Sequence, residues 1–286
     1  MVNYDNKNWL KLLFSFKGSV VNEIYPKVIF FTLNSLLITL FYEEVYKIKF
    51  SPVPFTIIGG VLGFLLVFRT NTSYDRYWEG RKLWGEITNQ TRNITVKTAT
   101  LLHDDLKHRD RIFELQKLFL YCIKEVVRDG IDIKRAEGIL KSEQIEVLKK
   151  SKIPHILVIS YIFAEVADLR KQQILGDAEF IGFSSNIDIL TAAAGGIERI
   201  RKTPIPISYA LHIKRLLFIF CFFVPFGFVD TIGWVTIPAV AFITYAFMGI
   251  EEIGVEIEDP FGTDQNDLPV DDIVLSLENC IDELKK

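Results

Sequence analysis

The segment FRTNTSYDRYWEGRKLWGEI, residues 68–87, begins a stretch that is densely charged and aromatic. The eighteen residues that end at Phe68, SPVPFTIIGGVLGFLLVF (residues 51–68), contain no charged side chain. Three arginines, one lysine and three acidic residues follow within the next eighteen positions, and neither proline nor glycine marks the boundary. A helix that leaves the apolar core of a bilayer and continues into water shows this pattern. The segment therefore predicts a membrane-spanning helix that extends beyond the membrane.

Four apolar runs of this kind occur in the 286-residue chain, at residues 28–42, 50–68, 216–229 and 231–250. A helix needs about 20 apolar residues to cross a bilayer, and tilt or snorkelling of flanking side chains accommodates the shorter runs. Buried helices of a soluble core are the alternative, but residues 216–250 contain a single charge, Asp230. We predict transmembrane helices at approximately residues 25–43, 51–70, 210–229 and 231–253.

Lysine and arginine residues near the ends of these runs predict the orientation. They precede the first and third runs and follow the second, whereas the connection between the third and fourth runs has none. Cytoplasmic loops are enriched in these residues. Both termini and the middle segment are therefore predicted to be cytoplasmic, in a multi-pass protein of the cell inner membrane or plasma membrane. The formal net charge of −3 leaves no basic excess for nucleic acid.

The rest of the chain has the periodicity of helices. DRIFELQKLFLYCIKEVVRDG (residues 110–130) places Ile112, Leu115 and Phe119 on one face and ends at Gly130, a predicted C-cap. A further amphipathic helix is predicted around Trp9, either on the membrane surface or docked against the protein. The predicted fold is an all-α integral membrane protein, one unit over residues 1–286, whose cytosolic helical region comprises residues 71–205 and 254–286.

Catalytic chemistry has little support in this sequence. The four histidines are scattered, and neither a His-x-x-x-His pair nor a phosphate-binding loop occurs. We therefore predict that the protein is not an enzyme.

An acidic cluster follows the fourth apolar run, around a Pro-Phe-Gly turn. Its members are Glu256, Asp259, Asp264 and Asp267. Calcium takes about six to eight oxygen ligands, several of them carboxylates, but no EF-hand spacing is present. The alternative is that Asp267 and Asp271 serve the terminal helix as caps or first-turn charges.

The second apolar run carries a stripe of residues spaced by four, namely Gly60, Phe64 and Phe68. Such spacing places them on one narrow face of a helix. If several subunits directed this face toward a common axis, the phenylalanine side chains would form stacked rings that gate by dewetting. The alternative is ordinary packing of phenylalanine against lipid or a neighbouring helix.

Three long segments resemble the bacterial branch of the bestrophin family. They are PFTIIGGVLGFLLVFRTNTSYDRYWEGRKLWG (residues 54–85), GGIERIRKTPIPISYA (195–210) and EIEDPFGTDQNDLP (256–269). With the four predicted spans, the resemblance covers residues 8–285. It implies a homopentameric ion channel with one central pore, four transmembrane helices per subunit and a cytosolic helical body.

The resemblance also implies roles for particular residues. Gly60, Phe64 and Phe68 match the three positions of the family's hydrophobic neck, although the family usually has a bulky aliphatic residue at the first of these. The neck is therefore expected to be wider at its outer end. Ala178 matches the cytosolic aperture, where the family typically has a larger aliphatic side chain, and this replacement predicts a looser constriction.

Calcium stays an alternative rather than an expectation. Animal members of the family bind calcium after the same Pro-Phe-Gly turn, through a run of acidic residues. In this chain the neutral Gln265 and Asn266 interrupt that run. We expect that no cofactor is required.

The sign of the permeant ion is left open by the residues below the neck. Arg69 and Arg76 could draw anions toward the pore, or pair with Asp75 and Glu79 and be neutralised. The expected permeants are small monovalent ions, with chloride-type anions favoured and sodium or potassium possible. The expected partners are other copies of the chain and membrane lipid. The alternatives are a membrane-anchored scaffold and a coupled transporter, although the inverted repeats of a transporter are not seen.

Overall fold

The four predicted apolar runs are helical in the computed structural model, which describes residues 10, 13–47, 49–128 and 133–286. The helices that contain them are α2 (Val21–Glu44), α3 (Val53–Leu101), α8 (Ile207–Ile232) and α9 (Thr236–Glu256). A short 3₁₀ turn, η2 (Gly233–Val235), joins α8 to α9. Each run lies in a segment long and apolar enough to cross a membrane. The third and fourth runs share one such segment, which η2 divides into α8 and α9, so all four predicted apolar helices are present. The amphipathic helix expected around Trp9 lies largely outside the described residues.

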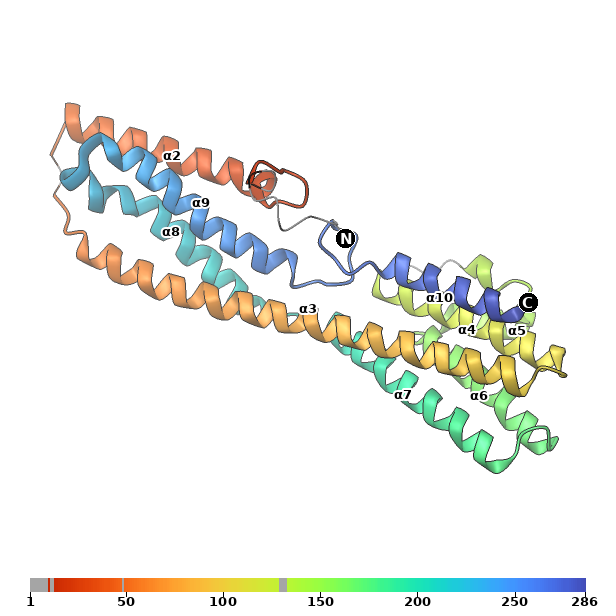
Figure 1. Cartoon of the computed structure of the whole chain (residues 1–286). Coiled ribbons are helices and arrows are strands. Elements are labelled where there is room, and N and C mark those ends of the chain that lie inside the picture. The colour runs from red at the N-terminus through yellow and green to blue at the C-terminus, as the bar shows by residue number, and fades with distance from the viewer. Residues whose placement is uncertain (1–9, 11–12, 48, 129–132) are drawn as a thin grey trace. The chain divides into compact units, whose positions relative to one another are not determined.

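The chain divides into two units, which we describe separately. Unit 1 lies within residues 1–77 and 204–267, and unit 2 within residues 78–203 and 268–286. Unit 1 holds α2, the first part of α3, α8 and α9, and Figure 1 shows α2, α8 and α9 side by side. The assignment of residues 71–205 and 254–286 to the cytosol stays a prediction.

The core of unit 1 is apolar and draws side chains from all four of its helices. Phe31 of α2, Leu62 and Leu66 of α3, Val224 of α8 and Val240 of α9 are among its buried members. These side chains come from runs without charges, so each helix turns one apolar face inward. The opposite faces stay apolar as well, as expected for helices surrounded by lipid.

Gly59 and Gly63 of α3 are spaced by four residues, and the first of them explains a close helix contact. A Cβ atom at Gly59 would lie 3.2 Å from Cζ of Phe220 on α8, whereas one at Gly63 would meet nothing within 4 Å. Gly59 therefore lets α3 approach α8. Gly63 takes no part in such a contact within the described chain.

The single acid of residues 216–250 has a specific partner. Asp230 lies in the last turn of α8, and its Oδ1 accepts a hydrogen bond of 2.6 Å from Oη of Tyr42 on α2. Asp230 is exposed, so this hydrogen bond gives its carboxylate a protein donor at the end of an apolar helix. The pair ties the ends of the two helices together.

Helix α3 is continuous for 49 residues, from Val53 to Leu101. It passes without a break from the uncharged segment into the charged segment that begins at Arg69. No proline follows Pro54 within it, so each later residue supplies the amide that the helix requires. This confirms the prediction that the second apolar helix continues beyond its apolar run.

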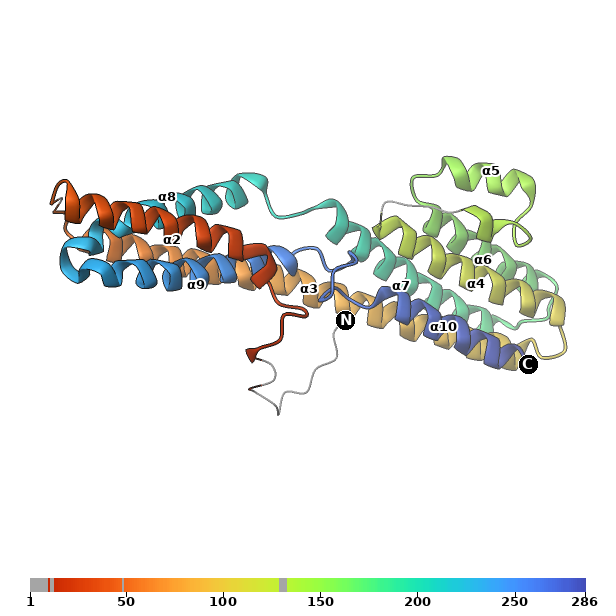
Figure 2. The same cartoon turned by 90° about the horizontal axis from the view of Figure 1, so that it is seen from above.

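Unit 2 is a bundle of helices, seen from above in Figure 2. Its elements besides the second part of α3 are α4 (Leu106–Val127), η1 (Ile133–Ala136), α5 (Ser142–Lys150), α6 (Pro154–Lys171), α7 (Asp177–Lys202) and α10 (Val270–Lys285). Ile112, Leu115 and Phe119 of α4 are buried, as their spacing predicts. Gly130, the expected end of this helix, lies outside the described residues.

Helix α7 is also long and apolar enough to cross a membrane by length and composition. The sequence places it in the cytosolic region instead. In unit 2 it packs against α6 and α4 and buries Phe183, Leu190 and Ile197. The apolar side chains of α7 thus contribute to the core of the helical bundle in unit 2.

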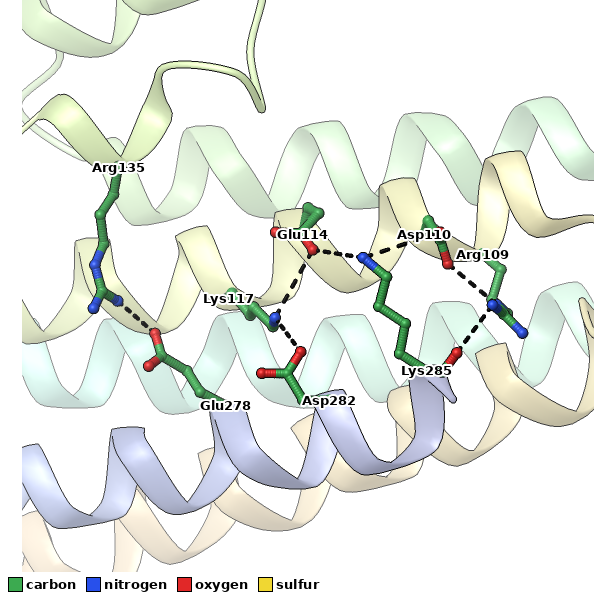
Figure 3. A network of polar contacts seen from close by, with 8 residues as sticks. All are labelled: Arg109, Asp110, Glu114, Lys117, Arg135, Glu278, Asp282 and Lys285. Carbon is green, nitrogen blue, oxygen red and sulfur yellow. Dashed lines mark hydrogen bonds and ion pairs between the residues drawn. The ribbon is translucent and has the colours of Figure 1, made fainter.

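The last helix, α10, is fixed to α4 by ion pairs (Figure 3). Nζ of Lys117 lies 2.5 Å from Oδ1 of Asp282, and Nζ of Lys285 lies 3.0 Å from Oε1 of Glu114. Surface pairs of this kind contribute about 0–1 kcal/mol each. The apolar face of α10, with Leu277 and Ile281 buried, therefore supplies most of the attachment.

Substituting alanine for Gly227 is expected to destabilise unit 1. A Cβ atom at this position of α8 would lie 2.3 Å from Cδ2 of Phe55, so the ring would have to move. Overpacking of this kind costs about 1–3 kcal/mol. The midpoint of thermal unfolding in detergent should fall for Gly227→Ala and stay unchanged or rise slightly for the control Gly63→Ala, whose Cβ meets open space. Equal midpoints for the two variants would contradict the packing.

Candidate functional site

The first part of α3 has two apolar faces with different surroundings. Leu62 and Leu66 are 0% and 1% exposed in the core of unit 1. Phe64 and Phe68 are 72% and 63% exposed, although both are large apolar side chains. Gly60, one turn before Phe64, is exposed as well, and a Cβ atom there would meet nothing within 4 Å. The structure thus brings Gly60, Phe64 and Phe68 together as one exposed stripe of α3, as their spacing predicts.

Arg69, directly after this stripe, points into the protein. It is 2% exposed, and one terminal nitrogen, Nη2, lies 3.4 Å from Oε2 of Glu258 and 3.9 Å from Oε1 of Glu251 on α9. Glu251 is itself 2% exposed and also lies 2.8 Å from Nζ of Lys214 on α8. We name these four residues the α3–α9 charge cluster. It joins the end of the exposed stripe to two other helices of unit 1.

Glu258 makes further contacts that hold the same region. Its backbone carbonyl oxygen accepts a hydrogen bond of 3.2 Å from Nε of Arg76, which lies about two turns after Arg69 on α3. Its Oε1 accepts from the backbone amide of Ile205, in the segment before α8. Glu258, two residues beyond the end of α9, therefore connects α3 to the segment before α8.

Arg69 pairs with other acids than the one the sequence suggested. The partners of Arg69 are Glu251 of α9 and Glu258, which lies two residues beyond that helix. Glu79 pairs with Arg199 of α7. The alternative of pairing within α3 does not describe Arg69, because Arg69 lies on the buried face of the helix and Asp75 on the exposed face. Sequence reasoning missed the roles of Glu251 and Glu258. No local signal marked them, because an arginine at the end of an apolar run ordinarily faces water and its partners here lie far away in the chain.

The acidic cluster surrounds a turn that its own side chains hold closed. Glu256, Asp259 and Asp264 line a cavity of about 420 Å³ in unit 1. The carboxylate of Asp267 accepts a hydrogen bond of 2.7 Å from the backbone amide of Asp264. Asn266 donates 3.0 Å hydrogen bonds to Oε1 of Glu256 and to the carbonyl oxygen of Gly18.

Of the two acidic residues suggested as caps or first-turn charges of the terminal helix, only Asp271 has such a role. Asp271 lies in the first turn of α10 and forms an ion pair of 2.6 Å with Arg128. Asp267 closes the preceding turn and does not cap the helix, whose N-cap residue is Pro269. Within the described part of the chain, no three His, Cys, Asp or Glu side chains are grouped as metal ligands would be.

The acidity of Asp267 predicts how stability varies with pH. Burial raises the pKa of its carboxyl group to about 6 in the folded protein, above the ordinary value of 3.8. A carboxyl that binds its proton more tightly when folded stabilises fully below about pH 4, and this contribution is lost as pH rises through about 6. As pH rises from about 4 to about 6, the free energy of unfolding of Asp267→Asn relative to that of the parent should therefore increase by on the order of 2 kcal/mol.

Thermal unfolding at a series of pH values checks this expectation. The control is Glu283→Gln, which removes an exposed carboxylate of α10 that has no part in raising the pKa of Asp267. A difference between Asp267→Asn and the parent that does not vary with pH would contradict the assignment.

Ala178 lies in the first turn of α7 with its side chain exposed in unit 2. The preceding residue, Asp177, forms an ion pair of 2.9 Å with Arg170 of α6. This contact orients the start of α7. The role of Ala178 in an aperture stays a prediction.

The chain matches the protein family described as Bacterial/Fungal Bestrophin protein over residues 1–283. The voltage-dependent anion channel-forming protein alr2987 of Nostoc sp. is 36% identical over 284 residues, which cover 97% of this chain and 92% of that protein. YneE of Escherichia coli K12, also named a voltage-dependent anion channel-forming protein, is 31% identical over 97% of this chain and 92% of its own length.

Solved structures give the same family likeness. A crystal structure of a bacterial bestrophin homolog from Klebsiella pneumoniae is similar with a TM-score of 0.86 and 26% sequence identity. The match covers 92% of this chain and 98% of that chain.

Proposed function

Since this chain belongs to the bacterial and fungal bestrophin family, whose members are ion channels and not enzymes, we propose that it forms a homopentameric channel for small anions. The observation that carries the proposal is the exposed stripe of Gly60, Phe64 and Phe68 on α3. Five copies of the chain around one axis would bury that stripe against itself and form a single pore. The relatives named as anion channel-forming proteins support the choice of ion.

The phenylalanine side chains suit the neck of such a pore. Two rings of five aromatic side chains form an apolar constriction, which closes when water leaves it. The edge of an aromatic ring is positive and its face negative, so edges turned toward the axis favour anions. Gly60 contributes no side chain, and the neck is therefore wide at that end.

Several further features belong to this proposal. Ala178 forms a loose second constriction, with a methyl group in place of a larger side chain. Both termini are cytoplasmic, and lipid surrounds the outer faces of α2, α8 and α9. Conduction requires no calcium, because Asp267 and Asn266 already use their side chains to close the acidic turn.

Single-channel recording in a planar bilayer tests the proposal. Purified protein under a potassium chloride gradient should give unitary currents whose reversal potential lies closer to the equilibrium potential of chloride than to that of potassium. The result should be the same with and without a calcium chelator. The mass of the detergent-solubilised complex should equal five chains. Properly assembled protein that passes no current would contradict the channel and favour a membrane-anchored scaffold, and a monomer or dimer that carries current would favour a coupled transporter.

A further inference from the structure

The face of α3 that carries the exposed phenylalanines continues to an acidic residue. Asp75 follows Phe68 by seven residues, which places it about 20° around the helix from Phe68 and ~10 Å further along. It is exposed, as the two phenylalanines are. All three residues belong to unit 1, so their alignment follows from one continuous helix.

The basic residues closest in sequence are turned away from this face. The guanidinium of Arg69 is buried in the α3–α9 charge cluster. Arg76 is half-buried and donates to the carbonyl oxygen of Glu258. Among the described residues, Asp75 has no ion-pair or hydrogen-bond partner. Its carboxylate is therefore not compensated by any residue that the structure describes.

The next acid on the same face behaves differently. Glu79, one turn beyond Asp75, is paired with Arg199 of α7. Its charge is compensated by that pair. Asp75 is thus an exposed acidic residue directly after the aromatic stripe, and it has no partner in the described part of the chain.

We propose that Asp75 sets the ion selectivity of the channel by limiting its preference for anions. The inference rests on the proposed function, because it requires the exposed face of α3 to line a pore. Five subunits then place five carboxylates in a ring about two helical turns from the inner aromatic ring. That ring lowers the local concentration of anions and raises that of cations at the mouth of the neck.

The size of the effect follows from Coulomb's law and screening. At ~0.1 M salt the Debye length is about 10 Å, comparable with the distance from the ring to the neck, so part of the field of five charges reaches a permeating ion. Removing the charges should raise the ratio of anion to cation permeability roughly three- to tenfold. At ~1 M salt the Debye length is about 3 Å, and the effect should almost disappear.

Reversal potentials measured under potassium chloride gradients test the inference, at a mean salt concentration of about 0.05 M and again at about 1 M. Asp75→Asn and Asp75→Ser remove the charge from an exposed side chain, and Asp75→Glu keeps it. The matched control is Glu23→Gln, which removes an exposed carboxylate of α2 instead.

At low salt, the reversal potential of both neutral variants should shift toward the equilibrium potential of chloride. At high salt this shift should be much smaller. Asp75→Glu and Glu23→Gln should show no shift. Currents with an unchanged reversal potential in both neutral variants would overturn this inference and leave the proposed channel intact. An equal shift in Glu23→Gln would overturn it too, since the charge would then act from anywhere on the subunit. Absence of current from the assembled parent protein would instead overturn the proposed function, and the inference with it.

Discussion

Replacing both Phe64 and Phe68 with alanine is expected to raise the conductance or the open probability of the channel by about tenfold or more. The two side chains are 72% and 63% exposed in the subunit, so their removal leaves its core intact. In the proposed neck they present only apolar surface to the axis, and a narrow apolar segment favours the dry, closed state. Alanine widens the segment and removes most of that surface. A tenfold change corresponds to about 1.4 kcal/mol of barrier.

The matched control for this prediction is Phe242→Ala. Phe242 on α9 is also 72% exposed, so its truncation removes the same ring from an equally exposed position of unit 1. Single-channel recording should give parental currents for this control and enlarged currents for the double alanine variant. If the double variant has the same mass and folding as the parent and gives parental currents, Phe64 and Phe68 do not form the gate.

The apolar helices could be predicted from the sequence because their signal is local. Residues 51–68 lack charge, and continuity of α3 beyond Phe68 follows from the absence of a helix-breaking residue at that point. The exposed stripe on α3 follows from spacing alone. Burial of Ile112 and Phe119 in α4 follows from the same periodicity.

The partners of the charged residues could not be predicted in this way. Arg69 meets Glu251 and Glu258, which lie more than 180 positions later in the chain. Sequence proximity suggested Asp75 instead, but neighbouring positions of a helix point in different directions. Exposure also differs among the aromatic residues of α3. Trp84 and Ile87 are fully buried, whereas Tyr74 is 54% exposed.

The charge cluster around Arg69 gives the second large effect. Removing one partner from a buried ion pair leaves an uncompensated charge and costs about 3–5 kcal/mol. Arg69→Met keeps most of the side-chain volume but leaves Glu251, 2% exposed, with Lys214 alone. The variant should therefore unfold at a clearly lower temperature in detergent. Because Arg69 directly follows Phe68, the position of Phe68 should also become less fixed, and single-channel recordings of the variant should show more variable open-channel current levels.

A double variant separates the charge from the packing. In Arg69→Met/Glu251→Gln the buried carboxylate is gone, and Lys214, whose side chain is 47% exposed, keeps its contact with water. This variant should recover at least about 1 kcal/mol of the loss, since a neutral amide is much less costly to bury than an anion. Thermal unfolding of the parent, both single variants and the double variant completes the cycle. If the two single losses simply added, Arg69 and Glu251 would not be coupled, and the stripe on α3 would have to be held in place by apolar packing of Leu62 and Leu66 alone.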